Sequence, residues 1–221
     1  MFNLFNKSDQ SLQNDVKTEL SWDPSVTNEQ ISVTAVDGVV TLRGTVPHYF
    51  EKCNAENAAQ RVGGVRAVAN EVEVKLLSDY ERSDQDIARA ALNALEWNYS
   101  APKGIKVSVE NGWVTLKGEV EWDFQRNAGR EAVSPLMGVR GVTNEITIKT
   151  KVLPSDVQTR IEDALKRTAE REGRKINVAI IGDKVKLTGN VHSYAEMDDA
   201  TNAAWNAPGV MKVQNDLKIA A

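Results

Sequence analysis

Hydrophobic residues recur at two alternating periods along the chain, and the same succession of periods is found three times. A helical spacing of four residues comes first, two stretches of alternating apolar and polar residues follow, and a second helical stretch precedes a last alternating one. The four-residue spacing is typical of an amphipathic helix, and strict alternation is typical of a half-buried strand. The pattern therefore predicts the element order α-β-β-α-β in each of three copies.

The first helix of each copy is marked by apolar residues at positions i, i+4 and i+8. They are Leu12, Val16 and Leu20 in the first copy, Ile87, Ala91 and Leu95 in the second, and Val157, Ile161 and Leu165 in the third. Ser83, with Asp86 three residues later, is typical of a helix start in the second copy. The stripe predicts that one face of each helix packs on a sheet.

A hairpin follows each first helix. Its first strand alternates apolar and polar residues, as in Ile31-Ser-Val33-Thr-Ala35. Asp37-Gly38 and Asn111-Gly112 then predict tight turns, because Asn or Asp followed by Gly readily adopts the positive φ angles of such turns. The third copy has Gly182-Asp183, an order that a different primed turn would accept.

The second helix of each copy carries small residues on its buried face, which allow close packing on the sheet. The stripes are Ala55, Ala58, Ala59 and Val62; Gly129, Ala132, Val133 and Leu136; and Ala200, Ala203, Ala204 and Ala207. A helical crossover between the last two strands predicts that they are parallel. We expect an α+β fold of three modules, each a small mixed three-stranded sheet with two helices on one face and polar residues on the other.

Glycine and asparagine landmarks fix the repeat. Gly44, Gly118 and Gly189 are separated by 74 and 71 residues, and the glycines Gly64, Gly138 and Gly209 have the same separations. We expect the first set to mark a bulge or a close contact between helix and sheet, and the second set to cap helices. Asparagines at a matching place in the last strands are expected to satisfy backbone groups; they are Asn70, Asn144 and Asn215.

These landmarks resemble the BON domain family, named for bacterial OsmY and nodulation proteins. The resemblance rests on the valine-threonine-leucine-x-glycine segment ending at Gly44 and Gly118 and on the later glycine-valine-x-x-valine-x-asparagine segment. It covers residues 8–76, 83–150 and 153–221 and leaves 1–7 as an N-terminal tail. It implies a non-enzymatic binding module of bacterial stress-response, osmotic-stress, envelope and transport-associated proteins, proposed to bind phospholipid.

Composition excludes several kinds of site. The net charge of -4 provides no overall positive field for nucleic acid. Cys53, His48 and His192 are the whole cysteine and histidine content, so we expect no disulfide framework, metal site, cofactor or catalytic constellation. The start of the chain lacks a basic, apolar signal, which predicts a cytoplasmic protein, or a periplasmic one if a signal was removed. No segment is long and apolar enough to span a membrane.

Two tryptophans and a basic stretch are the candidate binding residues. Trp22 and Trp97 occupy matching positions at the end of the first helix in two copies. An amphipathic ring there suits a membrane interface or a partner protein, although packing over the core margin is the favoured reading. A basic stretch in the third copy is a candidate for anionic headgroups. Its members are Lys166, Arg167, Arg171, Arg174 and Lys175.

Three functions remain open at this point. The first is binding to a phospholipid or membrane surface, which the family resemblance implies. The second is a cytoplasmic scaffold that binds other proteins through its sheet faces or tryptophan-bearing helix ends. The third is a binding protein that responds to small ions. The short linkers between copies predict that the modules pack against one another.

Overall fold

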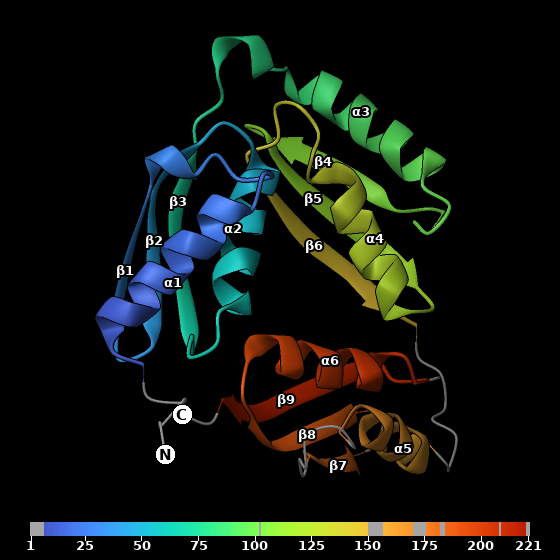
Figure 1. The fold of residues 1–221 in the computed structure, drawn as a ribbon. Helices are drawn as coiled ribbons and strands as arrows, with labels where there is room; N and C mark the ends of the chain where they lie inside the picture. The colour runs from blue at the N-terminus through green and yellow to red at the C-terminus, as the bar shows by residue number, and fades with distance from the viewer. Residues whose placement is uncertain are drawn as a thin grey trace.

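The computed structural model describes residues 7–101, 103–149, 157–169, 176–181, 184–207 and 209–219. Within them the order α-β-β-α-β is found three times, as the hydrophobic pattern predicts. Figure 1 shows three separate modules, each with its own sheet and a pair of helices. The α+β fold class is therefore confirmed.

The elements of the three modules have closely similar lengths. Module 1 contains α1 (Asp9–Trp22), β1 (Ile31–Val36), β2 (Val39–Val46), α2 (Tyr49–Arg61) and β3 (Ala67–Val74). Module 2 contains α3 (Asp84–Trp97), β4 (Lys106–Glu110), β5 (Trp113–Val120), α4 (Asp123–Val133) and β6 (Gly141–Ile148). Module 3 contains α5 (Val157–Ala169), β7 (Ile176–Ile181), β8 (Lys184–Val191), α6 (Tyr194–Trp205) and β9 (Lys212–Ile219). Two short 3-10 helices precede β1 and α3: η1 (Asn28–Gln30) and η2 (Ser78–Tyr80).

The second strand of each hairpin is the central strand of its sheet. In module 1 the strand order is β1-β2-β3, with β1 antiparallel and β3 parallel to β2. The other two sheets repeat this order. Each module has its own apolar core, in which the predicted first-helix stripe is buried, as Leu12, Val16 and Leu20 are. Each sheet is thus left with two edge strands.

The hairpin turns adopt the predicted conformation, whereas Gly44 makes a close contact with the neighbouring backbone and not with a helix packed on the sheet. Asp37 and Gly38 have φ angles of 50° and 77°, the positive pair that a type I′ turn requires, and Asn111-Gly112 repeats it. Gly44, at φ 143°, is a close backbone approach: a Cβ atom there would lie 1.8 Å from the carbonyl oxygen of Gln30. The Gly182-Asp183 turn lies outside the described residues.

The glycines after the second helices are turn residues and not helix caps. Helix α2 ends at Arg61, and Gly64 sits at the third position of a turn closed by a 3.2 Å hydrogen bond from the Val65 amide to the Val62 carbonyl. A residue at that position with φ of 98° favours glycine. The helix thus ends earlier than predicted, because the chain must reverse before β3.

The strand asparagines hold the second helix to the sheet. Asn70 donates from Nδ2 to the Lys52 carbonyl on α2 at 3.0 Å, and its Oδ1 accepts from the Val72 amide at 3.2 Å. Asn144 repeats both contacts in module 2, with the Arg126 carbonyl and the Ile146 amide. The predicted role of satisfying backbone groups is confirmed.

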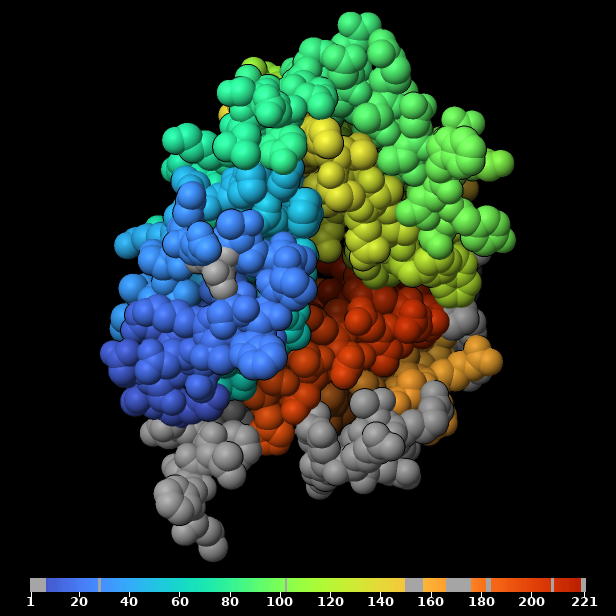
Figure 2. Space-filling model, turned by 45° about the horizontal axis from the view of Figure 1, so that its top comes forward, coloured from blue at the N-terminus to red at the C-terminus, as the bar shows by residue number. Residues whose placement is uncertain are grey.

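The three modules pack together through their second helices. In Figure 1, α2, α4 and α6 lie on the sides of their modules that face the other two. The Tyr194 hydroxyl, at the start of α6, donates to the Arg66 carbonyl at 2.6 Å, and Tyr194 packs against the core of module 1. Tyr49 and Trp205 pack in the same way against the core of module 2. Figure 2 shows the three surfaces meeting around a small hollow.

Candidate functional surfaces

Trp22 and Trp97 protrude into solvent. Their exposed fractions are 80% and 88%, so the reading that they pack over the core margin is wrong. Each lies two residues beyond the last buried leucine of its helix, Leu20 or Leu95. Two residues turn the side chain by about 200° around the helix, away from the sheet. The helix geometry therefore presents both rings outward.

The end of α3 carries more than its tryptophan. Tyr99, two residues past the helix, is fully exposed at 103%, and Lys103 in the same loop is also exposed. We call Trp97, Tyr99 and Lys103 the α3 tip. Trp97 and Tyr99 are the most exposed large apolar side chains of module 2. Sequence reasoning missed Tyr99, since a single aromatic residue in a loop carries no signal of its exposure.

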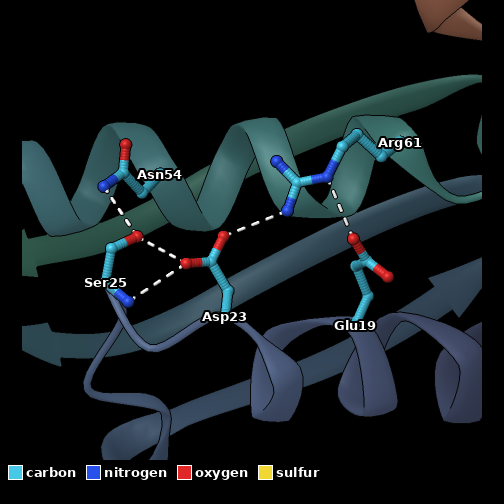
Figure 3. Close-up of polar contacts among 5 residues, drawn as sticks. All are labelled: Glu19, Asp23, Ser25, Asn54 and Arg61. Atoms are coloured by element: carbon cyan, nitrogen blue, oxygen red, sulfur yellow. Dashed lines mark hydrogen bonds and ion pairs between the residues drawn. The ribbon is translucent and has the colours of Figure 1, made fainter.

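The corresponding end of α1 is tied down by polar contacts. Asp23 accepts hydrogen bonds from the Ser25 amide at 3.1 Å and hydroxyl at 2.5 Å, and it pairs with Arg61 on α2 at 3.0 Å. Arg61 also reaches Glu19 on α1 at 2.9 Å, and Asn54 donates to the Ser25 hydroxyl (Figure 3). The Ser25 hydroxyl first, and Arg61 after it, lower the pKa of Asp23. The surface beside Trp22 is therefore an ion-paired, acidic one.

The open faces of the sheets are polar, as predicted, and carry ion pairs. Arg43 pairs with Glu71 across β2 and β3 at 2.6 Å, and Lys117 pairs with Glu145 at the matching place in module 2 at 3.0 Å. In module 3, Lys186 pairs with Asp216 at 3.0 Å. A face covered with paired charges is suited to water and not to insertion among acyl chains.

A partly buried tyrosine, Tyr49, and a buried carboxylate, Asp123, stand at matching places at the start of the second helix in modules 1 and 2. Burial, and then the neighbouring Cys53 thiol, raise the pKa of Tyr49 to about 12. In module 2 the matching residue is Asp123, which is buried, pairs with Arg126 and accepts from Asn127 at 2.9 Å. The Arg126 guanidinium in turn lies 4.7 Å from the centre of the Trp205 ring of module 3. Of these residues, Tyr49 joins module 1 to module 2, and Arg126 joins module 2 to module 3 through Trp205.

Comparison with known proteins assigns the family. The sequence model of the BON domain matches residues 8–75, 83–150 and 155–221. The chain belongs to the BON domain family. One curated relative, the "Osmotically-inducible protein Y" of Escherichia coli (strain K12), is 34% identical over 67 residues. That alignment covers 30% of this chain and 33% of the relative, so the match is about one BON module long.

Two solved structures of one protein also match. They are described as "Structural studies of CdsD, a structural protein of the Type III secretion system (TTSS) of Chlamydia trachomatis" and as the C-terminal domain of CdsD. The identities are 16% and 15%, and each TM-score is 0.26. The alignments cover 92% and 97% of this chain, and 90% and 100% of those chains. A similarity at this TM-score carries no argument about this BON protein.

The basic stretch of the third BON module is only partly described. Lys166 and Arg167 fall in the last turn of α5, and their side chains lie outside the described part. Arg171, Arg174 and Lys175 lie outside the described residues altogether. Headgroup binding by this stretch stays a prediction.

The two histidines have different surroundings. His48 stacks on Phe50, with ring centres 5.4 Å apart, and its ring is tilted against that of Tyr80, with ring centres 4.5 Å apart, while His192 is exposed. Over residues 7–149 and the described parts of module 3, no three His, Cys, Asp or Glu side chains are grouped to hold a metal ion. In the same residues, no helix has both the length and the apolar character needed to cross a bilayer.

Proposed function

We propose that this BON protein is a non-enzymatic, stress-related binding protein that contacts anionic phospholipid surfaces through the α3 tip. The observation that carries the proposal is the exposure of Trp97 at 88% beside fully exposed Tyr99. Tryptophan and tyrosine are the side chains that favour the membrane-water interface, because each has an apolar ring and a polar atom. Stress-related function is supported by the similarity to "Osmotically-inducible protein Y".

Charge favours module 2 over module 1 as the contact site. Lys103 stands in the same loop as Tyr99, and it balances the charge of exposed Glu96 in the last turn of α3, since the loop from Asn98 to Gly104 contains no acidic residue. An amine near an anionic surface contributes about 1 kcal/mol of binding free energy. At the end of α1, in contrast, the two carboxylates of Asp23 and Glu19 share the single guanidinium of Arg61, so the local charge is negative and would repel the same headgroups. We therefore infer that Trp97 has the main role and Trp22 a minor one.

Cosedimentation with vesicles tests the proposal. Vesicles containing phosphatidylglycerol are expected to bind the protein at low salt, and vesicles of phosphatidylcholine alone are expected to bind it weakly. Trp97→Ala should weaken the binding about tenfold or more, because burial of a large aromatic ring contributes roughly 1.5–3 kcal/mol. Lys103→Glu should also weaken vesicle binding at low salt, and it should have little effect at high salt.

Matched controls separate the surfaces. Trp22→Ala alters the equivalent residue of module 1 and should reduce binding much less than Trp97→Ala. A combined Lys166→Glu and Arg167→Glu variant tests the basic stretch of module 3. Equal pelleting of wild-type protein and Trp97→Ala, or no binding at low salt, would refute the role of the α3 tip.

The alternative functions predict other results. A cytoplasmic scaffold would bind a partner protein and ignore vesicles of either composition. A small-ion-responsive protein would show saturable amide shifts during titration with a cation, beyond those that ionic strength alone produces.

A further inference from the structure

In modules 1 and 3, a glutamine of the first helix covers a backbone carbonyl on the outer edge strand. Gln13 on α1 donates from Nε2 to the Val33 carbonyl of β1 at 2.6 Å, and Gln158 on α5 donates to the Val178 carbonyl of β7 at 3.2 Å. Both carbonyls point out of the sheet, where a further strand would bind. A side chain that covers such a carbonyl protects the edge from pairing with another chain.

Module 2 lacks this protection. The residue of α3 that matches Gln13 is Ala88, which has no donor, and over the described chain no side chain reaches the carbonyl of Val107 on β4. Val107 itself is only partly buried, whereas the matching Val33 and Val178 are 2% and 7% exposed. The β4 strand is therefore an open edge.

The helix flank above this edge is apolar only in module 2. Leu92, one turn after Ala88, is 53% exposed, and together they form a small apolar strip. The residues that match Leu92 are Lys17 in module 1 and Glu162 in module 3. A helix position that is charged in the other two modules thus carries an apolar side chain here, and this side chain lies on the same flank as the uncovered edge of β4.

The open face of β4 carries two unpaired opposite charges. Lys106 and Glu110 stand at the two ends of the strand on the same face, with Ser108 midway. Lys106 lies opposite Lys117, a like charge that disfavours its position. Neither Lys106 nor Glu110 has an ion partner among the described residues, while Lys117 is paired with Glu145. The edge thus presents a positive group two residues before Ser108, at Lys106, and a negative group two residues after it, at Glu110.

We propose that β4 pairs antiparallel with β4 of a second copy of this chain, about a two-fold axis at Ser108. Lys106 then faces Glu110 of the second copy, and Glu110 faces its Lys106. The backbone agrees with this register: Val107 and Val109 both present outward amides and carbonyls, and they become opposite each other as a hydrogen-bonded pair. The two module 2 sheets join into one six-stranded sheet, and the Ala88-Leu92 strips meet above it.

The register is specific to self-pairing. A slip by one residue would turn every side chain to the wrong face. A slip by two residues in either direction would keep the faces but would set Lys106 or Glu110 opposite Ser108 and remove both ion pairs. The same chain supplies both charges at the spacing that its own two-fold copy requires, which is why a second copy suits this edge.

Sedimentation velocity over a range of concentrations tests the proposal. The wild-type protein should show a monomer-dimer equilibrium. Lys106→Glu places Glu opposite Glu at both ends, and it should raise the dissociation constant about tenfold or more. The double variant Lys106→Glu/Glu110→Lys restores opposite charges in the same register and should recover the dimer. If the dimer formed through another surface, the exchange of Lys106 and Glu110 would not restore it.

Two further variants complete the test. Asn177→Glu changes the residue of β7 that matches Lys106 and should leave the dimer intact. Ala88→Gln supplies the missing glutamine and should abolish the dimer while the far-ultraviolet spectrum stays unchanged. The proposal fails if the wild type sediments as a monomer at all concentrations, or if the charge exchange does not restore the dimer. Trp97→Ala should leave the dimer unchanged, so this result is separate from lipid binding.

Discussion

The Tyr194 hydroxyl and the Arg66 carbonyl, 128 residues apart in the chain, are joined by a hydrogen bond of 2.6 Å. The contact links the start of α6 in module 3 to the residue before β3 in module 1. Tyr49 stands at the matching position of module 1 and packs against module 2. The first residue of the second helix therefore serves as a connector between modules at two junctions.

Removal of the Tyr194 hydroxyl should loosen the junction between modules 1 and 3. Tyr194→Phe keeps the ring and loses a hydrogen bond, which contributes about 1 kcal/mol. We expect a lower urea midpoint and faster amide exchange in α6. Tyr99→Phe, at a fully exposed tyrosine, is the control and should change neither measurement. Equal midpoints for both variants would show that the contact does not stabilise the assembly.

Alkaline pH should lower the stability of the fold through ionisation of Tyr49. Its pKa is raised to about 12, mainly by burial, from an ordinary value of 10.0. Since the unfolded chain loses this proton first, stability is present in full below pH 10 and declines as the pH rises toward 12. Tyr49→Phe should remove the latest step in the tyrosinate absorbance titration and flatten the fall in stability. The pKa of Tyr194 is also raised by burial, so Tyr194→Phe is the companion titration.

The Asp23 network predicts an order of effects on one pKa. The Ser25 hydroxyl is the main group that lowers the pKa of Asp23, and Arg61 acts after it. Ser25→Ala should therefore raise that pKa more than Arg61→Met does, as measured by carboxyl carbon shifts against pH. Because the folded value is depressed below 3.8, the associated stability is present above that pH and is lost as the pH falls through the folded value. The opposite order would contradict this assignment.

Two glycines at matching places should respond differently to a methyl group. Gly44→Ala would bring Cβ to 1.8 Å from the Gln30 carbonyl oxygen at a φ of 143°, and we expect a loss of about 3 kcal/mol or more. At Gly118 the nearest atom to such a Cβ lies 3.5 Å away, at Ile105, so Gly118→Ala should cost far less. Thermal unfolding of both variants measures the contrast. Similar losses would show that the backbone of module 1 can relax.

Local chemistry explains why so much of the fold was predictable. Buried positions recur with the period of the helix or strand that contains them. The spacing of Leu12, Val16 and Leu20 and the alternation around Val33 therefore indicate which side of each element is buried. Asp37-Gly38 and Asn70 are likewise decided by contacts within a few residues or between neighbouring elements. The end of α2 was not predicted correctly, because the turn at Gly64 serves the strand that follows and not the helix before it.

The candidate surfaces were only partly predictable. Trp22 and Trp97 were found from their matching positions, but their orientation was misjudged because the helix continues two residues past its last buried leucine. Tyr99 was missed, because nothing in the pattern marks a single loop aromatic as exposed. The open edge of β4 becomes visible only when Ala88 is compared with Gln13 and its hydrogen bond to Val33.

The sequence by itself determined three copies of one α-β-β-α-β module, because repeated periods of burial and turn residues specify local elements without knowledge of their neighbours. Only the tertiary structure decided how modules meet through Tyr194 and Tyr49, and which edges stay open. Those features depend on contacts between residues far apart in the chain, such as Tyr194 with Arg66. Such contacts leave no periodic trace in the order of amino acids, since each involves a single side chain meeting a backbone group of another module.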